Sequence, residues 1–402
     1  MLFVTRRALA YSSLPALILG AIWFFQSRSA EEYREDESDG SYAEVAESAQ
    51  PGTTQKSAIY PVGAAPPPAH MSLEYAEYSR SDAIIEEFSI EKAAAFIDDA
   101  AVKWGRKHGC VTCHTNGYYL IAPNEIFQHR PAALEVREFA EQFVDSWYHE
   151  GLPDVEIVVA TAAFLAINNM QTEGELRPAT IEALEEAWAQ QSEEGHWAEW
   201  LKCNWPPFEQ DDHYGPTLLA IAMGMAPASY IEIEPARSGI ARLLRYLKTH
   251  PAQEIHHKAM MLWASAYHAD LVNTNQSNQW IDEIMALQRS DGGWASGSLG
   301  VWRQLQGRPS DPPVGIESDG YGTGFIVFVL REAGVPASDP SIQDGIAWLK
   351  THQQIDGKWF TQSLRNEPDT SNFLTHTGTT FALKALIAGD LSGNPDYLHR
   401  ME

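Results

Sequence analysis

Five consecutive residues carry the most specific chemical pattern in the chain, Cys110-Val111-Thr112-Cys113-His114, which reads Cys-x-x-Cys-His. This is the signature of covalently attached c-type haem. Each cysteine forms a thioether with one vinyl group of the porphyrin, and the histidine binds the iron. On a helical turn, cysteines at i and i+3 face the same side. We therefore expect Cys110, Cys113 and His114 to hold one haem c.

Three other uses of a cysteine pair stay open: a zinc half-site, a thioredoxin-like redox pair and a structural disulfide. Zinc needs two further Cys or His ligands in a matching cluster, and the third cysteine, Cys203, stands alone in the sequence. A redox pair is expected beside a βαβ unit, whereas the pattern here is helical. With three cysteines in all, a disulfide-rich scaffold is excluded.

The sequence does not fix the second axial ligand of the iron. A Met or His in that position would favour electron transfer, and an open position would favour catalysis or gas binding. Besides open coordination, the candidates are Met170, Met223, Met225, His129, His149 and His213.

The first 30 residues have the features of an export segment. Arg6 and Arg7 precede an uncharged run at 8–25, which is typical of a signal sequence or membrane anchor. The run lies at the short limit of the roughly 20 residues that span a bilayer, and we favour a retained anchor over a cleaved signal. Haem c is attached to proteins after their export. The haem motif and the N-terminal segment therefore both predict a location on the periplasmic side of a bacterial membrane.

Residues 31–82 predict a disordered linker. Eight acids fall between Glu31 and Glu47, and a proline run follows at 64–69. Such a segment has too few apolar residues to offset the entropy of folding. Over all 402 residues, 28 Lys and Arg stand against 54 Asp and Glu, a net charge of −26, which argues against a nucleic-acid partner.

From Ser89 onward the hydrophobic period predicts two alternating kinds of helix. Some have one apolar stripe and should lie outside, and others are apolar all round and should be enclosed by neighbours. Six outer-inner pairs result, which could close into a ring. They are 89–109 with 114–127, 133–150 with 154–170, 178–192 with 215–227, 236–250 with 255–270, 277–289 with 319–333, and 340–353 with 375–388.

A sequence motif, Gln-x-x-x-Gly-x-Trp, follows three of the outer helices, at 191–197, 288–294 and 353–359. We expect its glycine to end the helix in the left-handed conformation. The glutamine can bond backbone amides or carbonyls at the end of a neighbouring helix. The tryptophan can pack over the contact between the two helices. Such self-similarity predicts stacked units that share one core.

This motif resembles the QW motif of squalene-hopene cyclases. The whole segment from about 85 to 395 resembles the α/α toroid of terpenoid cyclases and protein prenyltransferase β-subunits. The resemblance implies an all-α fold, a single α6-α6 toroid within residues 83–395, with parallel inner helices around an apolar cavity. The haem motif would open the first inner helix, at a rim where helix N-termini gather. The residues expected there are Glu156, Asp211, Asp212, His213, His256, His257, Asp319 and His376.

Prenyltransferase β-subunits hold zinc with Asp-x-Cys at one inner-helix start and a His at a later one. Asp319-Gly320-Tyr321 and His376 resemble this set, with Tyr321 in place of the cysteine. The resemblance thus implies at most a weaker second metal site of Asp319 and His376. Asp212 and Asp319 also stand where helix N-caps belong.

Class II terpene cyclases protonate their substrate with Asp-x-Asp-Asp, which Glu209-Gln210-Asp211-Asp212 resembles. The resemblance implies Asp211 as the general acid, with Asp212 beside it, since burial against apolar walls raises the pKa of a carboxyl. Two departures stand against it: such cyclases usually carry a second helical barrel, and Tyr214-Gly215 follows where Thr-Ala is common.

Three functions follow, and they leave open whether the protein is an enzyme. The favoured one is an exported, membrane-tethered toroid whose haem couples redox chemistry or electron transfer to an apolar ligand such as an isoprenoid. The second is a haem-free cyclase-like enzyme with Asp211 as acid. The third is a non-catalytic binding or electron-transfer module with a redox protein as partner.

Overall fold

The computed structural model describes residues 78–197, 200, 206–208, 212–302, 315–364 and 372–391, all within one compact unit. The expected membrane segment at 1–30 and nearly all of the linker at 31–82 lie outside these residues. In the part of the chain that the structure describes, every regular element is helical, and the sole β feature is an isolated bridge between Ile84 and Gln354. The all-α prediction is confirmed.

The helices follow the six expected pairs with shifts of a few residues. The pairs are α1 (Ile90–His108) with α2 (Asn116–Leu120) and α3 (Asn124–Phe127), α4 (Pro131–Glu150) with α5 (Val155–Thr172), α6 (Pro178–Ala189) with α7 (Tyr214–Met225), α9 (Ala236–Thr249) with α10 (Ile255–Ser265), α11 (Thr274–Met285) with α12 (Gly320–Glu332), and α13 (Pro340–Thr351) with α14 (Leu374–Leu386). Short helices α8 (Ala228–Ile231), η1 (Ser296–Leu299) and η2 (Ile387–Leu391) lie between or after them.

One expected helix is broken. The segment 114–127 forms two short helices, α2 and α3, separated at Ile121–Pro123. Pro123 has no N–H to donate to the preceding turn and disfavours a helical residue before it. The sequence prediction of one continuous inner helix is therefore wrong at this pair.

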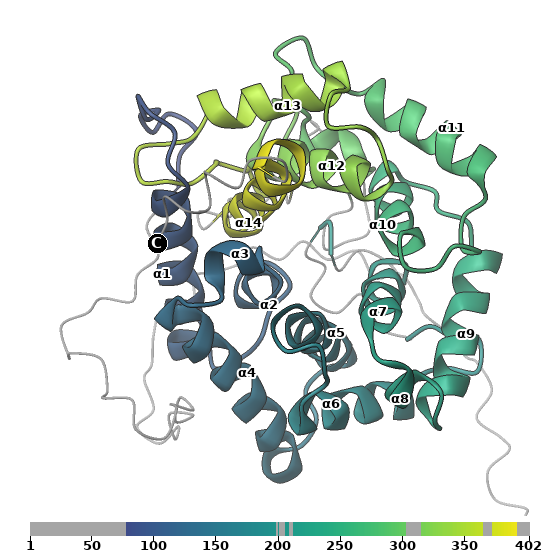
Figure 1. Ribbon diagram of the computed structural model, residues 1–402. Helices are drawn as coiled ribbons and strands as arrows, with labels where there is room; N and C mark the ends of the chain where they lie inside the picture. The colour runs from purple at the N-terminus through teal and green to yellow at the C-terminus, as the bar shows by residue number, and fades with distance from the viewer. Residues whose placement is uncertain are drawn as a thin grey trace, which may run out of the picture. The chain divides into compact units, whose positions relative to one another are not determined.

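The helices form two layers. Figure 1 shows α2, α5, α7, α10, α12 and α14 inside an outer row that includes α1, α4, α6, α9, α11 and α13. The inner helices pack on one another in the order α2, α5, α7, α10, α12 and α14, and α14 packs in turn on α2. Almost every residue of α7, α12 and α14 is buried, as expected for helices that are apolar all round.

The inner helices run in the same direction, because starts contact starts and ends contact ends. At the starts, Tyr214 donates to Tyr118 at 3.0 Å, and the Tyr321 hydroxyl lies 2.7 Å from Nε2 of His256. At the other end, Lys384 near the end of α14 donates to the carbonyl of Ile121, just after α2. The N-termini of the inner helices therefore gather at one end of this unit.

The three Gln-x-x-x-Gly-x-Trp segments make the same contacts. Each glutamine amide donates to the carbonyl of its own glycine and to a carbonyl at the start of the next outer helix, namely Gly239, Ser341 and Ser89. Each indole donates to a carbonyl ten residues earlier, at 2.7 to 2.9 Å. The bond from Gln353 to the carbonyl of Ser89, the N-cap of α1, connects the last outer helix, α13, to the first.

The glycine of this segment is required by close packing as well as by its φ angle. Gly357 has φ 101°, and a Cβ atom there would lie 2.3 Å from the carbonyl of Lys92 in α1. The glycine lies in the turn after the helix and does not itself end it, since α13 ends at Thr351. This corrects the expectation of a helix-capping glycine.

Within the described residues, one helix is long and apolar enough to cross a membrane by length and composition, α5. Two thirds of it (67%) is buried against other helices. A core helix passes the same test, and its burial here is that of a core helix.

Candidate functional site

The Cys-x-x-Cys-His segment lies in the loop between α1 and α2. Gly109, with φ 65°, ends α1, and α2 begins only at Asn116, so the motif is not on a helical turn as the spacing suggested. The loop is held by the Asn116 side chain, whose oxygen accepts from the Thr112 N–H and whose amide donates to the Cys110 carbonyl, both at 2.9 Å. This side chain satisfies backbone groups that a helix would otherwise have paired.

Both cysteines of the motif are thiols. Cys113 is buried, and Cys110 is half-buried at the end of α1. Burial raises the pKa of the Cys110 thiol, and a hydrogen bond with the Trp104 side chain lowers it. Thioether formation with a haem would require both side chains as thiols.

The His114 ring is packed between two aromatic side chains. It stacks on Phe373 with centroids 4.9 Å apart and meets Trp104 edge-on at 4.7 Å. Burial, with smaller effects of His376 and His108, holds the pKa of His114 well below its usual value. The imidazole is consequently neutral at physiological pH, the form that binds metals.

A chain of hydrogen bonds leads away from His114. The Thr115 hydroxyl lies 2.9 Å from Nδ1 of His114 and 2.9 Å from Nδ1 of His376. Nε2 of His376 lies 2.9 Å from the Tyr78 hydroxyl. Burial lowers the pKa of His376 to about 3, so this second imidazole is also neutral. The chain fixes the His114 ring from its Nδ1 side.

Two features of His114 are compatible with its expected role as an iron ligand. Thr115 engages Nδ1 of His114, and a hydrogen bond at one ring nitrogen is the usual arrangement for a histidine whose other nitrogen binds a metal. The Phe373 ring covers a face of the imidazole, whereas a metal binds in the ring plane. Residues 303–314 and 365–371, which precede two other inner helices in the sequence, lie outside the described residues.

The parallel helices narrow the choice of second axial ligand. Met170, Met223 and Met225 lie in the last turns of α5 and α7, at the end opposite to His114, and His129 follows α3 at that same end. These four candidates therefore lie away from the motif, and residue type alone does not tell at which end of an inner helix a side chain lies. Of the other two, His149 lies in the last turn of the outer helix α4, and His213 precedes α7 and stacks on His257 at 4.4 Å.

The proposed second metal site is divided between two other roles. Asp319 caps α12 and accepts from the backbone N–H of Gly322 and Ser296 and from the Ser296 hydroxyl, at 2.7 to 2.8 Å. Both ring nitrogens of His376 face hydroxyls, as described above. Among the described residues there is no group of three or more His, Cys, Asp or Glu side chains that could hold a metal ion.

The acidic motif of the cyclase alternative is only partly visible. Asp211 lies outside the described residues. Asp212 does not cap α7, whose N-cap is His213, and its carboxylate instead lies 3.3 Å from Nδ1 of His196. The other expected residues of this end, Glu156, His256 and His257, are buried at the starts of α5 and α10.

Aromatic rings fill the space between the inner helices. Tyr118, Phe208, Tyr214, Tyr321 and Phe381 contact one another with centroids 5.1 to 5.8 Å apart, and all are fully buried. Three cavities among the described residues lie elsewhere, and each is bordered by at least one outer helix. Among the described residues, these five aromatic side chains pack where the resemblance implies an apolar cavity.

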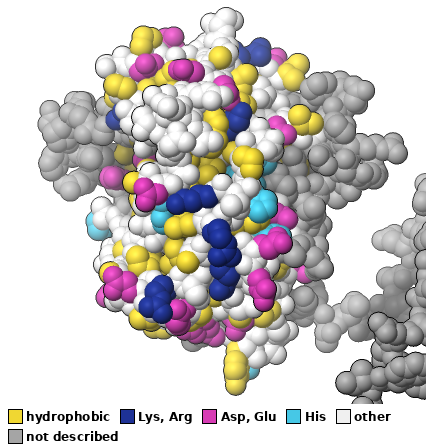
Figure 2. Space-filling model, turned by 90° about the vertical axis from the view of Figure 1, so that its right-hand side faces the viewer, with side chains coloured by type: hydrophobic (Ala, Val, Ile, Leu, Met, Phe, Trp, Pro, Cys, Tyr) yellow, Lys and Arg dark blue, Asp and Glu magenta, His cyan; other side chains and the backbone are white. Residues whose placement is uncertain are grey.

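The outer surface has one basic helix in an acidic chain. Between residues 236 and 249, α9 carries Arg237, Arg242, Arg245 and Lys248 and no acid. Figure 2 shows the side of the molecule on which α9 lies, with Lys and Arg side chains among scattered acids. Arg242 donates to the side chain of Gln191 at 2.8 Å, so part of this charge supports the joint between α6 and α9.

The chain matches no known protein-family model and no curated protein sequence.

Two residues beside the motif were missed by sequence reasoning. Thr115 contacts His376, 261 positions away, and no local pattern signals such a contact. Asn116 could have been noticed, since an Asn at the start of a helix often bonds nearby backbone groups.

Proposed function

We propose that this protein is an exported, membrane-tethered electron-transfer protein that carries one haem c on Cys110, Cys113 and His114. The observation that supports it is the environment of His114: a neutral, buried imidazole held at Nδ1 by Thr115, next to two thiols. When bound, the haem supplies a one-electron redox centre.

The fold that we propose for residues 83–395 is a single α6-α6 toroid, as in the squalene-cyclase-like proteins. Two contacts support closure: α14 packs on α2, and Gln353 bonds the backbone of Ser89 at the start of α1. The common end of the inner helices would then be the rim that carries the haem.

The residues around the motif have separable roles in this proposal. Asn116 fixes the backbone of the loop that carries the two cysteines. Thr115 and His376 hold the His114 ring and its Nδ1–H, because the Thr115 hydroxyl can accept from His114 while it donates to His376. Trp104 and Phe373 exclude water from the imidazole.

We favour electron transfer over a reaction on an apolar ligand because aromatic side chains fill the space between the inner helices in the described residues. The haem-free cyclase would depend on Asp211 and on an open cavity. It would survive Cys110→Ala and be lost in Asp211→Asn, whereas a haem protein would show the reverse.

The test is a potentiometric titration of the purified, periplasmically matured protein, followed by absorbance with and without carbon monoxide. The proposal predicts a reversible one-electron couple and a reduced spectrum that carbon monoxide leaves unchanged, since an electron-transfer iron has both axial positions filled. A reduced spectrum that shifts on addition of carbon monoxide would instead favour catalysis or gas binding.

A further inference from the structure

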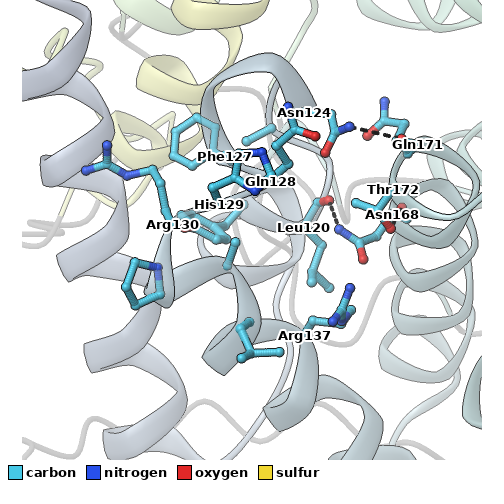
Figure 3. A pocket seen from close by; sticks show the side chains of 15 residues that line it. Leu120, Asn124, Phe127, Gln128, His129, Arg130, Arg137, Asn168, Gln171 and Thr172 are labelled. Carbon is cyan, nitrogen blue, oxygen red and sulfur yellow. Dashed lines mark hydrogen bonds between the residues drawn. The ribbon is translucent and has the colours of Figure 1, made fainter. Parts of the chain in front are cut away.

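Two cavities of similar volume lie at the end of the inner helices opposite to the Cys-x-x-Cys-His segment, and their linings differ in charge. The first, of about 260 Å³, lies between α3, α4 and α5, and its lining, shown in Figure 3, includes two arginines and a histidine but no acid. The second, of about 240 Å³, is lined by Glu175, Glu185 and Glu234 and by no Lys, Arg or His. We call the second one the acidic cavity, and the proposed function does not use it.

The acidic cavity is assembled from three segments that are distant in sequence. Residues 175–185 run from the end of α5 into α6, residues 227–230 follow α7 and include α8, and residues 233–236 lead into α9. The indole of Trp188 in α6 donates to the Tyr230 hydroxyl in α8 at 3.0 Å, which fixes these two helices relative to each other. The cavity is therefore a defined feature of the folded unit.

Apart from the glutamates, the walls of the acidic cavity are mostly apolar. Tyr230 is buried, whereas the large apolar side chain of Ile233 is 56% exposed. A ligand whose apolar body covers Ile233 would remove this surface from water, which is favourable. The apolar lining residues are Leu176, Ile181, Pro227, Tyr230, Ile233, Pro235 and Ala236.

Two of the three lining carboxylates are not paired with a cation. Glu234 accepts from the Arg237 guanidinium at 2.7 Å. Glu175 and Glu185 are exposed to solvent, and neither has an ion pair or a hydrogen bond with any described residue. Burial, with a smaller effect of Glu185, raises the pKa of Tyr230 to about 12, so this carboxylate lies near the aromatic wall. Negative charge and apolar surface thus occur side by side.

Such a lining is complementary to a cation with an apolar body. An ammonium group only donates hydrogen bonds and a carboxylate only accepts them. Exposed ion pairs contribute little by themselves, so the apolar body must supply much of the affinity. The volume is just below the range of about 300–1,000 Å³ for small-molecule sites, which limits a ligand to roughly one ring. We propose that the acidic cavity binds a small organic ammonium ion, with its nitrogen attracted by Glu175 and Glu185 and its apolar body against Tyr230 and Ile233.

The test uses four probes on the purified full chain: benzylamine, benzyl alcohol, sodium benzoate and methylammonium chloride. Binding is measured by isothermal titration calorimetry and by ligand-observed NMR at low ionic strength. We expect saturable binding of benzylamine, at least about fivefold tighter than that of the uncharged, the anionic or the ring-free probe, and weaker in high salt. Absence of saturation by benzylamine, or an equal affinity for benzyl alcohol or methylammonium, would overturn the proposal.

Variants assign the binding to this cavity. The double variant Glu175→Gln, Glu185→Gln should weaken benzylamine binding at least about fivefold. Glu182→Gln, Glu232→Gln is the matched control, because both glutamates are exposed, lie in or beside α6 and α8, and do not line the cavity. Ile233→Ala should weaken benzylamine and benzyl alcohol alike, by about twofold or more. Circular dichroism melts verify folding, and equal benzylamine affinities of the two double variants would contradict the assignment.

Discussion

The Thr115 hydroxyl lies 2.9 Å from Nδ1 of His376, which joins the start of the first inner helix to the start of the last across 261 positions of sequence. The same hydroxyl lies 2.9 Å from Nδ1 of His114. One small side chain therefore couples the packing of α14 on α2 to the orientation of the expected iron ligand.

Replacing this hydroxyl should change the redox potential of the haem protein. Thr115→Val removes the acceptor for the His114 Nδ1–H, so the imidazole becomes a less basic ligand and the oxidised iron is less stabilised. We expect the midpoint potential to rise, by on the order of tens of mV, while covalent haem content stays that of wild type. Thr115→Ser keeps the hydroxyl and should restore the potential, which a purely structural defect would not allow.

Gln353 should contribute measurably to stability because it joins α13 to α1. It is fully buried, donates to the carbonyls of Ser89 and Gly357, and accepts from the Ser89 N–H. Gln353→Ala should lower the free energy of unfolding in urea by about 2–4 kcal/mol. The exposed Gln343, which donates only to the Ala337 carbonyl, is the control, and its alanine variant should cost less than about 0.5 kcal/mol. If Gln353→Ala and Gln343→Ala lowered the free energy of unfolding equally, the contact between α13 and α1 through Gln353 would add no stability.

Alanine variants of Gly334 and Gly357 should distinguish the cost of backbone strain from the cost of a steric clash. At Gly334 (φ 89°) a Cβ atom would meet no other part of the chain within 4 Å, whereas at Gly357 (φ 101°) it would lie 2.3 Å from Lys92 backbone atoms. Gly334→Ala should cost about 1–2 kcal/mol, from conformation alone. Gly357→Ala should cost at least about 2 kcal/mol more, since α1 and α13 must move apart. Thermal unfolding of both variants measures the difference, which should vanish if the two segments can separate freely.

Lys384 should give stability an unusual dependence on alkaline pH. Its amine is buried, donates to the Ile121 carbonyl and lies 4.5 Å from the Phe328 ring, and burial lowers its pKa to about 8. Between pH 8 and about 10.4 the unfolded chain holds a proton that the folded chain has lost, so stability rises with pH through this window, by about 3 kcal/mol at most.

The difference between wild type and Lys384→Met isolates this effect from the titration of other groups. Relative to the variant, wild-type stability in urea should increase from pH 8 to about 10.4. The exposed Lys248 provides the control, and Lys248→Met should follow wild type throughout. A pH-independent difference between wild type and Lys384→Met would mean that Lys384 ionises alike in both states.

The hydrophobic period predicted the helices well because each inner helix must bury all its faces. Nearly every residue of α7 and α12 is buried. Asp319 was correctly expected as a cap of α12, whereas Asp212 was not a cap, because His213 takes that position. Contacts such as that of Thr115 with His376, and the end of the helix bundle at which a Met or His lies, depend on tertiary packing. The set of axial-ligand candidates and the filled centre could therefore not be predicted from local sequence.

The central claim is tested most directly by the intact mass and pyridine haemochrome absorbance of the protein expressed with a c-type haem maturation system. We predict a mass increase of one haem that survives denaturation in wild type, and none in a Cys110→Ala, Cys113→Ala double variant. A wild-type protein that matures at the unmodified mass, with no haemochrome absorbance, would contradict the account.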